Sequence, residues 1–351
     1  MRKIGILTFH NVMNYGAVLQ CYALQKVINK RYGNCTVIPY VNKQLAWNDK
    51  PVHLTPFNVK TIAKTVSQGL GNLKKRKAFD VFLSEYLQLG DASNLANYTD
   101  IVVGSDQVWN VNLTNNDYTY FLEDYNGNKY AYAASFGEDD IPEDALKRIK
   151  EDVSRFAAVS VREQAAWQVL NKEKIESQVV IDPVLLLEEG EWKKTVINSQ
   201  AHKEKYILVY CVEKSKRAFD YARRLSDRMG LKIYYLNQNM FFKEKGLIYK
   251  SGVSPIEFLN YIQDAEYIVT NSFHGTAFSI IFEKKFAVDT IWHGKKNIRI
   301  SNLLSMFELN DRDMNSLNEN IGQEIDYTSV KVVLVENRKL AQQFLDKCFV
   351  E

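Results

Sequence analysis

One turn of this sequence places a histidine where acid–base chemistry is feasible. Residues 267–270 are rich in β-formers, residues 271–275 form a polar turn, and residues 276–282 show a helical pattern. Such a unit brings side chains and backbone N–H groups to the carboxyl edge of a parallel sheet. Because histidine ordinarily titrates near neutral pH, we predict that His274 is catalytic. A structural histidine that ties two loops together is the alternative. The neighbouring candidate substrate contacts are Ser272, Phe273, Gly275 and Thr276.

A second candidate is an arginine at the end of a predicted strand. Residues 157–161 have the composition of a buried strand, and Arg162 follows them directly. The planar guanidinium group can bind a phosphate or a carboxylate through two hydrogen bonds. We therefore predict that Arg162 holds an anionic group of a substrate. The alternative is an ordinary ion pair with Glu163 or another neighbour.

A third candidate is the turn after the first predicted strand, residues 4–9. It contains Asn14, Tyr15 and Gly16, and a helical pattern begins at residue 17. Backbone N–H groups and the helix dipole attract anions at the start of a helix. Two interpretations stay open: these residues bind a substrate, or Asn14 only caps the helix and Gly16 only permits the turn.

Two further predicted strands end in small polar residues. Residues 101–103 lead into Ser105 and Asp106, and residues 129–137 include Ser135 near their end. We include all three side chains as candidate substrate contacts. Asp106 is either an acceptor for a sugar hydroxyl or a cap of the next helix. His10 and His293 lie in predicted loops near the same edges, and either is a candidate to assist.

Strands and helices alternate through both halves of the chain. This pattern predicts an α/β fold with two Rossmann-like, doubly wound domains facing a cleft. We predict a first domain over residues 1–195 with an insertion near 42–78, and a second over 196–328. Residues 188–204 are expected to be a linker, residues 79–87 a helix, and residues 239–250 a loop. Residues 329–351 are expected to form a helix that packs back on the first domain.

The composition is that of a globular protein, with 46% apolar and 25% charged residues in a chain of 351. The formal net charge of +3 is too small to predict a nucleic-acid partner. The basic run from Lys74 to Lys77 is expected to be a solvated helix face. Alternatively, it steers an anionic ligand or holds the protein at an acidic membrane surface, on the inner face of the membrane.

Several classes of site are not indicated by the sequence. The four cysteines have no CxxC spacing, which argues against zinc and disulfides and suits a reducing compartment. No cluster has the spacing of a metal site, so we expect activity to survive chelation. There is no G-x-G-x-x-G or P-loop motif. The first residues look like a strand rather than a signal peptide, and no apolar stretch reaches the roughly 20 residues of a membrane helix. We predict a cytoplasmic protein.

Six motifs, in order, resemble those of the polysaccharide pyruvyl transferase family. They are Asn14-Tyr15-Gly16-Ala17-Val18-Leu19-Gln20, Val103-Gly104-Ser105-Asp106-Gln107-Val108-Trp109, Ala134-Ser135-Phe136-Gly137, Val159-Ser160-Val161-Arg162-Glu163, Asp182-Pro183 and Ser272-Phe273-His274-Gly275-Thr276-Ala277. Each motif alone is weak, but six in order are specific. The resemblance implies two Rossmann-like domains arranged as in a GT-B glycosyltransferase. It also implies transfer of pyruvate from phosphoenolpyruvate to two hydroxyls of a sugar, without a cofactor, to form a cyclic ketal in a surface polysaccharide or cell-wall glycan.

The resemblance also assigns roles to single residues. The family's essential histidine falls on His274 and its donor-binding arginine on Arg162. His274 would act as the general acid or manage the proton of the acceptor hydroxyl, while Arg162 and Arg299 would hold the phosphate or the carboxylate. The implied partners are phosphoenolpyruvate and a sugar acceptor that is lipid-linked, nucleotide-linked or polymeric. A homo-oligomer is compatible with the sequence.

Two alternatives remain at this point. The first is a glycosyltransferase that uses a nucleotide-sugar donor on the same two-domain scaffold. The second is a non-catalytic protein that binds glycans.

Overall fold

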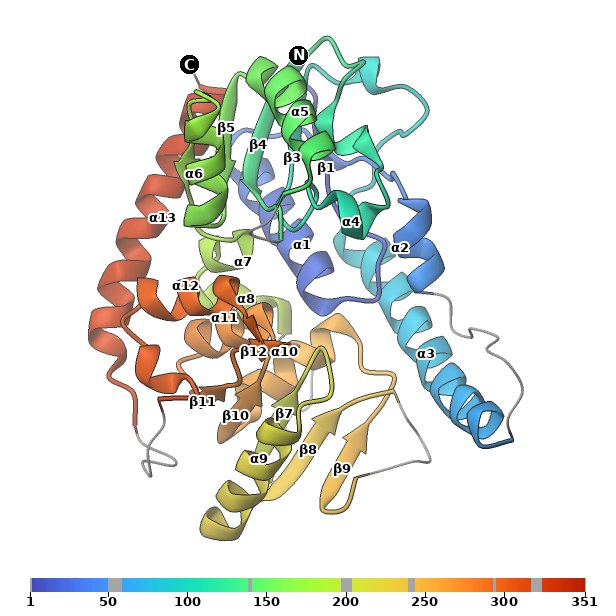
Figure 1. Cartoon of the computed structure of the whole chain (residues 1–351), viewed down its shortest axis with the longest axis vertical. Helices are drawn as coiled ribbons and strands as arrows, with labels where there is room; N and C mark the ends of the chain where they lie inside the picture. Colours follow the sequence, from blue (N-terminus) through green and yellow to red (C-terminus); the bar gives the residue numbers. More distant parts are fainter. Residues whose placement is uncertain are drawn as a thin grey trace. The chain divides into compact units, whose positions relative to one another are not determined.

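The computed structural model describes residues 2–49, 59–137, 141–196, 204–238, 244–292, 295–316 and 324–350 (Figure 1). The chain divides into two compact units, and each has its own parallel sheet. The first unit comprises Met1–Asp49, Leu83–Leu187 and Leu334–Glu351, and the second comprises Lys50–Phe82 and Glu188–Val333. The predicted fold class, α/β with two Rossmann-like sheets, is confirmed.

The sheet of the first unit is parallel throughout, with the strand order β2-β1-β3-β4-β5-β6. The strands are β1 (Ile4–Leu7), β2 (Cys35–Val37), β3 (Asp100–Val103), β4 (Asn128–Ala134), β5 (Ala158–Val161) and β6 (Gln178–Val179). β1 and β3 are buried at every position, as expected when helices cover both faces. The strand order reverses between β1 and β3, so the connections that follow them run to opposite faces.

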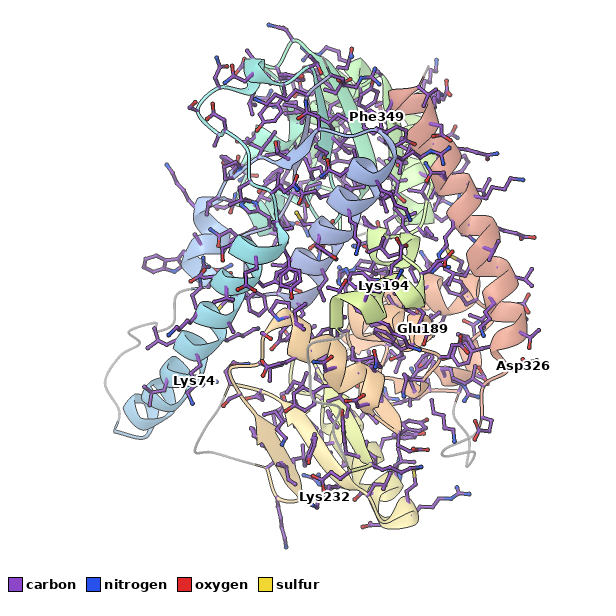
Figure 2. The ribbon with its side chains drawn as sticks, turned by 180° about the vertical axis from the view of Figure 1, so that it is seen from behind. Lys74, Glu189, Lys194, Lys232, Asp326 and Phe349 are labelled. Atoms are coloured by element: carbon purple, nitrogen blue, oxygen red, sulfur yellow. The ribbon has the colours of Figure 1, made fainter. Side chains whose placement is uncertain are left out.

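Helices cover both faces of the first sheet. α5 (Glu143–Asp152) and α6 (Gln164–Lys172) pack on the face that carries Ala131. Tyr130 and Tyr132 point the other way, because side chains alternate along a strand, and they contact the rings of Phe349 and Phe344 (Figure 2 labels Phe349). The remaining helices of this unit are α1 (Tyr15–Arg31), α2 (Lys43–Asn48), α4 (Val111–Thr114) and α7 (Pro183–Leu186), with 3-10 turns at Leu95–Asn97, Tyr118–Phe121 and Val153–Arg155.

The sheet of the second unit is also parallel, with the order β11-β10-β7-β8-β9. The strands are β7 (Tyr206–Tyr210), β8 (Lys232–Leu236), β9 (Leu247–Lys250), β10 (Tyr267–Thr270) and β11 (Lys285–Val288). Here the order reverses between β7 and β10. A short antiparallel pair, β12 (Ile291–Trp292) and β13 (Lys295–Lys296), follows β11.

Helices cover both faces of this sheet as well. α9 (Lys216–Met229) packs on the face that carries Val209, and it begins after the Ser215 cap and ends at Gly230, which has a left-handed backbone. Tyr210 points to the other face, where its ring meets Phe258 of α10 at 4.9 Å. The other helices are α8 (Glu189–Val196), α10 (Pro255–Asp264), α11 (Phe273–Ile281) and α12 (Ile298–Met306), with a 3-10 turn at Asn310–Arg312.

Two long helices contain residues of both units. α3 (Val59–Tyr86) runs from the later part of the expected insertion into the helix that we expected separately, since no proline interrupts it. α13 (Tyr327–Phe349) covers the expected C-terminal helix. Its last turns belong to the first unit, where Asp346 pairs with Arg31 at 2.8 Å and Arg338 donates to the Leu185 carbonyl at 2.7 Å.

Two segments differ from the sequence-based expectation. The expected loop contains β9, which adds to the sheet because Leu247 and Tyr249 both pack on its core. The expected linker begins with α8, a charged helix whose Trp192 is fully buried against Phe278 at 5.1 Å. Within the described ranges, no helix has both the length and the apolar character that a membrane crossing requires.

Candidate functional site

The turn after β10 is held by its own side chains. Ser272 caps α11, and its Oγ accepts a hydrogen bond from the Gly275 N–H at 3.2 Å. Thr270 Oγ1 accepts from the Ser272 N–H at 3.0 Å. A Cβ on residue 275 would lie 2.4 Å from this hydroxyl, so the position requires glycine. Thr276 donates to the Ser272 carbonyl at 2.9 Å. The predicted order of strand, turn and helix is confirmed, although α11 begins at Phe273, three residues earlier than predicted, so the turn is shorter.

This turn lies where the strand order of the second sheet reverses. Asn271 joins the ends of β7 and β10, because its Oδ1 accepts from the Val212 N–H and its Nδ2 donates to the Glu213 carbonyl, each at 2.9 Å. In open α/β sheets, ligands bind outside the carboxyl ends of the strands at such a reversal. The residues after β10 therefore occupy the part of this unit in which a ligand site is expected.

His274 occupies the first turn of α11 and is 8% exposed. The ring of Phe273 meets its imidazole edge to face, with 5.1 Å between the ring centroids. α12 packs against α11 and carries Arg299, which is half-buried, in its own first turn. The second unit thus supplies a histidine and an arginine from adjacent helices. The candidate His293 lies outside the described residues.

In the first unit, Asn14 is the cap of α1. Its Oδ1 accepts hydrogen bonds from the N–H groups of Gly16 at 3.0 Å and Ala17 at 3.4 Å. Asn14 is exposed, whereas Tyr15 and Gly16 are buried. We considered these two N–H groups as donors to a substrate anion, but in the structure they point at the side chain of Asn14. This geometry is the one that the capping alternative describes.

Arg162 is the centre of a buried network of carboxylates. Its Nε donates to Glu163 Oε1 and its Nη1 to Asp182 Oδ2, both at 2.9 Å, and its Nη2 lies 3.9 Å from Asp106 Oδ1. The side chain is 3% exposed, and that of Asp182 is fully buried. Burial alone would lower the pKa of Arg162, but the three carboxylates raise it above the ordinary arginine value. The ion pair considered from the sequence is present, and it is larger than a single pair.

The two candidate serines of this unit join the same network. Ser105 Oγ lies 3.2 Å from Asp182 Oδ2 and donates to the Ala133 carbonyl at 3.0 Å. Ser135 Oγ donates to Glu163 Oε1 at 3.0 Å. The loops that end β3, β4 and β5 are therefore tied together through carboxylates at one edge of the sheet. Asp106 lies at this edge with a left-handed backbone, at a φ of 75°.

The sequence reasoning missed two members of this network. Asp182 appeared only in the Asp182-Pro183 motif, and Glu163 only as a neighbour of Arg162. A signal was available for Asp182, because it directly follows the apolar residues 179–181, and a carboxylate buried there needs a partner. Among the described residues, no group of three or more His, Cys, Asp or Glu side chains is arranged to hold a metal ion.

His10 is buried close to the same edge, after β1. It is 2% exposed, and its Nδ1 lies 3.3 Å from the Thr8 carbonyl. Burial lowers the pKa of His10, and the contact with the Thr8 carbonyl offsets only part of this effect. Thr8 Oγ1 donates to the Ser105 carbonyl at 2.7 Å and accepts from Gln20 Nε2 at 3.0 Å. His10 therefore lies beside a hydrogen-bonded chain that ends at the Ser105 loop.

Several solved structures are similar to this chain over nearly its whole length. The UDP-GlcNAc 2-epimerase of Methanocaldococcus jannaschii, in complex with UDP-GlcNAc and UDP, is 13% identical with a TM-score of 0.47, and the match covers 96% of this chain and 99% of the epimerase. A putative UDP-N-acetylglucosamine 2-epimerase of Listeria monocytogenes is 11% identical with a TM-score of 0.48, at 98% coverage of both chains. A UDP-glucosyltransferase of Polygonum tinctorium is 9% identical with a TM-score of 0.39, covering 99% of this chain and 93% of that one.

A comparison with curated proteins found no match. The model of one protein family, described as polysaccharide pyruvyl transferase, matches residues 14–288. The matched range is most of the chain and contains all six motifs, the Arg162 network and the His274 turn, whereas His10 and Arg299 lie outside it. The chain therefore belongs to the polysaccharide pyruvyl transferase family.

Proposed function

We propose that this protein transfers pyruvate from phosphoenolpyruvate to two hydroxyls of one sugar, forming a cyclic ketal in a surface polysaccharide or cell-wall glycan. The observation that carries the proposal is the family match, which includes a histidine in the first turn of a helix at the reversal of the second sheet. Four buried, unpaired cysteines agree with a reaction in the reducing cytoplasm.

The reaction needs one proton at the start and returns it at the end. Protonation of the methylene carbon of phosphoenolpyruvate makes a methyl group and leaves an electron-poor C2. One sugar hydroxyl attacks C2 and loses its proton, and inorganic phosphate leaves. The second hydroxyl then attacks C2, loses its proton and closes the ring. One of the two hydroxyl protons replaces the proton used on the methylene carbon, and the other leaves on the phosphate. The products are the ketal and phosphate, and no oxidant or reductant is required.

We assign the donor to the second unit. The start of α11 favours an anion because the helix dipole is positive there, and α12, which packs against α11, carries Arg299 in its first turn. In this assignment His274 gives the proton to the methylene carbon or manages the proton of the attacking hydroxyl. Positioned acid–base groups of this kind contribute roughly 100- to 10,000-fold to a rate.

We assign the sugar acceptor to the edge of the first unit. Three carboxylates surround the single guanidinium of Arg162, so the local charge opposes a phosphate and suits neutral hydroxyls, which donate to carboxylates. Asp106 is the candidate acceptor for such a hydroxyl. In this assignment Arg162 positions the loops that carry Ser105 and Ser135. This role differs from the one that the family resemblance implies for Arg162, which is to hold the donor.

The experiment measures phosphate release from phosphoenolpyruvate across a panel of sugar acceptors, with the ketal identified by mass spectrometry. His274→Ala should lower turnover by about 100-fold or more while the thermal melt stays close to that of the wild type. Full activity of the His274→Ala variant would rule out an acid–base role for His274. Release of a nucleotide from a nucleotide sugar would show a glycosyltransferase instead, and sugar binding without any product would show a binding protein.

A matched control perturbs the same helix away from its first turn. The Tyr327 hydroxyl donates to the Lys284 carbonyl at 2.7 Å and lies 3.3 Å from the Ser279 carbonyl, near the far end of α11. Tyr327→Phe removes these contacts without touching the histidine. It should lower the melting temperature and leave turnover nearly unchanged, because activity depends on the first turn of α11.

A further inference from the structure

One face of helix α3 is buried. Phe79 and Phe82 on this face are 1% and 2% exposed. Gly71 lies so close to Gln238 that a Cβ on residue 71 would be 2.0 Å from the Gln238 carbonyl oxygen. The opposite face of the helix, over residues 68–81, is turned to solvent.

The exposed face of α3 is more apolar than a solvated helix face needs to be. Leu70, Leu73 and Val81 are 45%, 53% and 46% exposed. Lys77 lies among them at the three- and four-residue spacing of one helical face. Lys74 is also exposed and lies at the border of this face, where its stem packs against Gly252. A single exposed leucine is ordinary, but an aligned row of aliphatic side chains marks an interaction surface.

The charge of the same segment is strongly positive. Residues 68–82 contain four basic side chains and one acidic side chain, Asp80, which pairs with Arg76 at 2.8 Å. Lys75 lies over the ring of Phe79 at 5.1 Å, toward the buried face. Within the described part of the chain, neither Lys74 nor Lys77 has a carboxylate partner; Figure 2 labels Lys74 on α3.

We propose that the exposed face of α3 binds the surface of a membrane that carries anionic lipids. The lysines meet the headgroups, and the aliphatic side chains enter the boundary between headgroups and acyl chains, as in interfacial amphipathic helices. The face from Leu70 to Val81 extends about 16 Å along the helix, at 1.5 Å per residue. This length suits an extended anionic surface, whereas one phosphate ion needs donors that converge on a point.

Membrane binding is separate from the proposed reaction. No residue of α3 belongs to the candidate site in either unit, so variants on its exposed face should keep the turnover of a water-soluble substrate. The result of the binding test therefore does not depend on whether the pyruvyl transfer is correct.

The test is co-sedimentation of the purified full chain with lipid vesicles. We expect binding to vesicles of phosphatidylcholine and phosphatidylglycerol mixed two to one, no binding to phosphatidylcholine alone, and release at high salt. Lys74→Gln/Lys77→Gln should weaken the partition by about 30-fold, from the loss of two lysines at the surface. Leu70→Ser/Leu73→Ser should weaken binding while its salt dependence stays the same.

The matched control is a pair of exposed lysines on another helix of the same unit, Lys193→Gln/Lys194→Gln on α8. This control should bind like the wild type, and all variants should show wild-type melts. The proposal is overturned if the folded wild type ignores anionic vesicles, if phosphatidylcholine alone binds it equally well, or if the control weakens binding as much as the α3 pair. Salt-sensitive binding to double-stranded DNA without vesicle binding would assign the face to another polyanion and also overturn it.

Discussion

Replacing Arg162 by methionine tests the buried carboxylate network directly. Methionine keeps an unbranched side chain but removes both 2.9 Å hydrogen bonds, to Glu163 and Asp182. The two carboxylates then stay buried without their cation, since their side chains are 9% and 0% exposed. Removing one partner of a buried ion pair typically costs about 3–5 kcal/mol. For a unit of ordinary size, this corresponds to a loss of roughly 10 °C in melting temperature.

Arg31 provides the matched control in the same unit. It also makes two hydrogen bonds to one carboxylate, Asp346, at 2.9 and 2.8 Å, but its side chain is 51% exposed. Water can solvate both groups after Arg31→Met, so this variant should melt much closer to the wild type than Arg162→Met. The assay is scanning calorimetry of the full chain, with each transition fitted separately because the chain has two units. Equal losses from the two variants would refute the reasoning.

Arg162→Lys separates the two roles considered for this residue. A lysine keeps the charge but not the planar fork, so it cannot hold Glu163 and Asp182 in the observed geometry. If Arg162 positions the loops, the variant should lose stability and turnover together, with little change in the KM for phosphoenolpyruvate. A normal melt with a raised donor KM would instead support the donor-binding role.

Two further predictions concern a buried histidine and a close helix contact. Since burial lowers the folded-state pKa of His10, the wild type should lose stability as the pH falls below about 6.5. The His10→Gln variant should lose less stability over the same range, as measured by thermal melts from pH ~8 to ~5. The same dependence of melting temperature on pH in the variant and the wild type would contradict this prediction. Gly71→Ala should destabilise the protein by about 1–3 kcal/mol, because its Cβ would lie 2.0 Å from the Gln238 carbonyl. The control is Gly190→Ala in α8, whose added Cβ would have no atom within 4 Å and which should be neutral or stabilising. Both variants are measured by urea denaturation.

The local units of this protein were predictable because their signals act over a few residues. The apolar run before Asn271, the Ser272 cap and the helical pattern after it predicted β10 and α11. Ser254 followed by a proline is a local signal of the same kind at the start of α10, where the capping box with Glu257 is observed. Cap and turn preferences are set by hydrogen bonds within one turn of chain, so no distant contact is needed to read them.

Partners that come from distant strands were not predictable. Arg162 was recognised at a strand end, but its contacts with Asp182 and Asp106 exist only because β5 and the segments after β3 and β6 end at one edge of the sheet. The sequence favoured binding of a substrate anion by Arg162, with an ion pair as the alternative. Only the register of the sheet showed that protein carboxylates surround it.

The sequence by itself determined the two alternating α/β halves, the family motifs and the position of His274 at the start of a helix, because these depend on local pattern. The tertiary structure decided which faces are buried. It packed Trp192 of an expected linker into the core, placed β9 in the sheet, and left Leu70 and Leu73 of α3 exposed beside lysines. Burial depends on which surfaces meet after folding, and no local pattern specifies the partner of a surface.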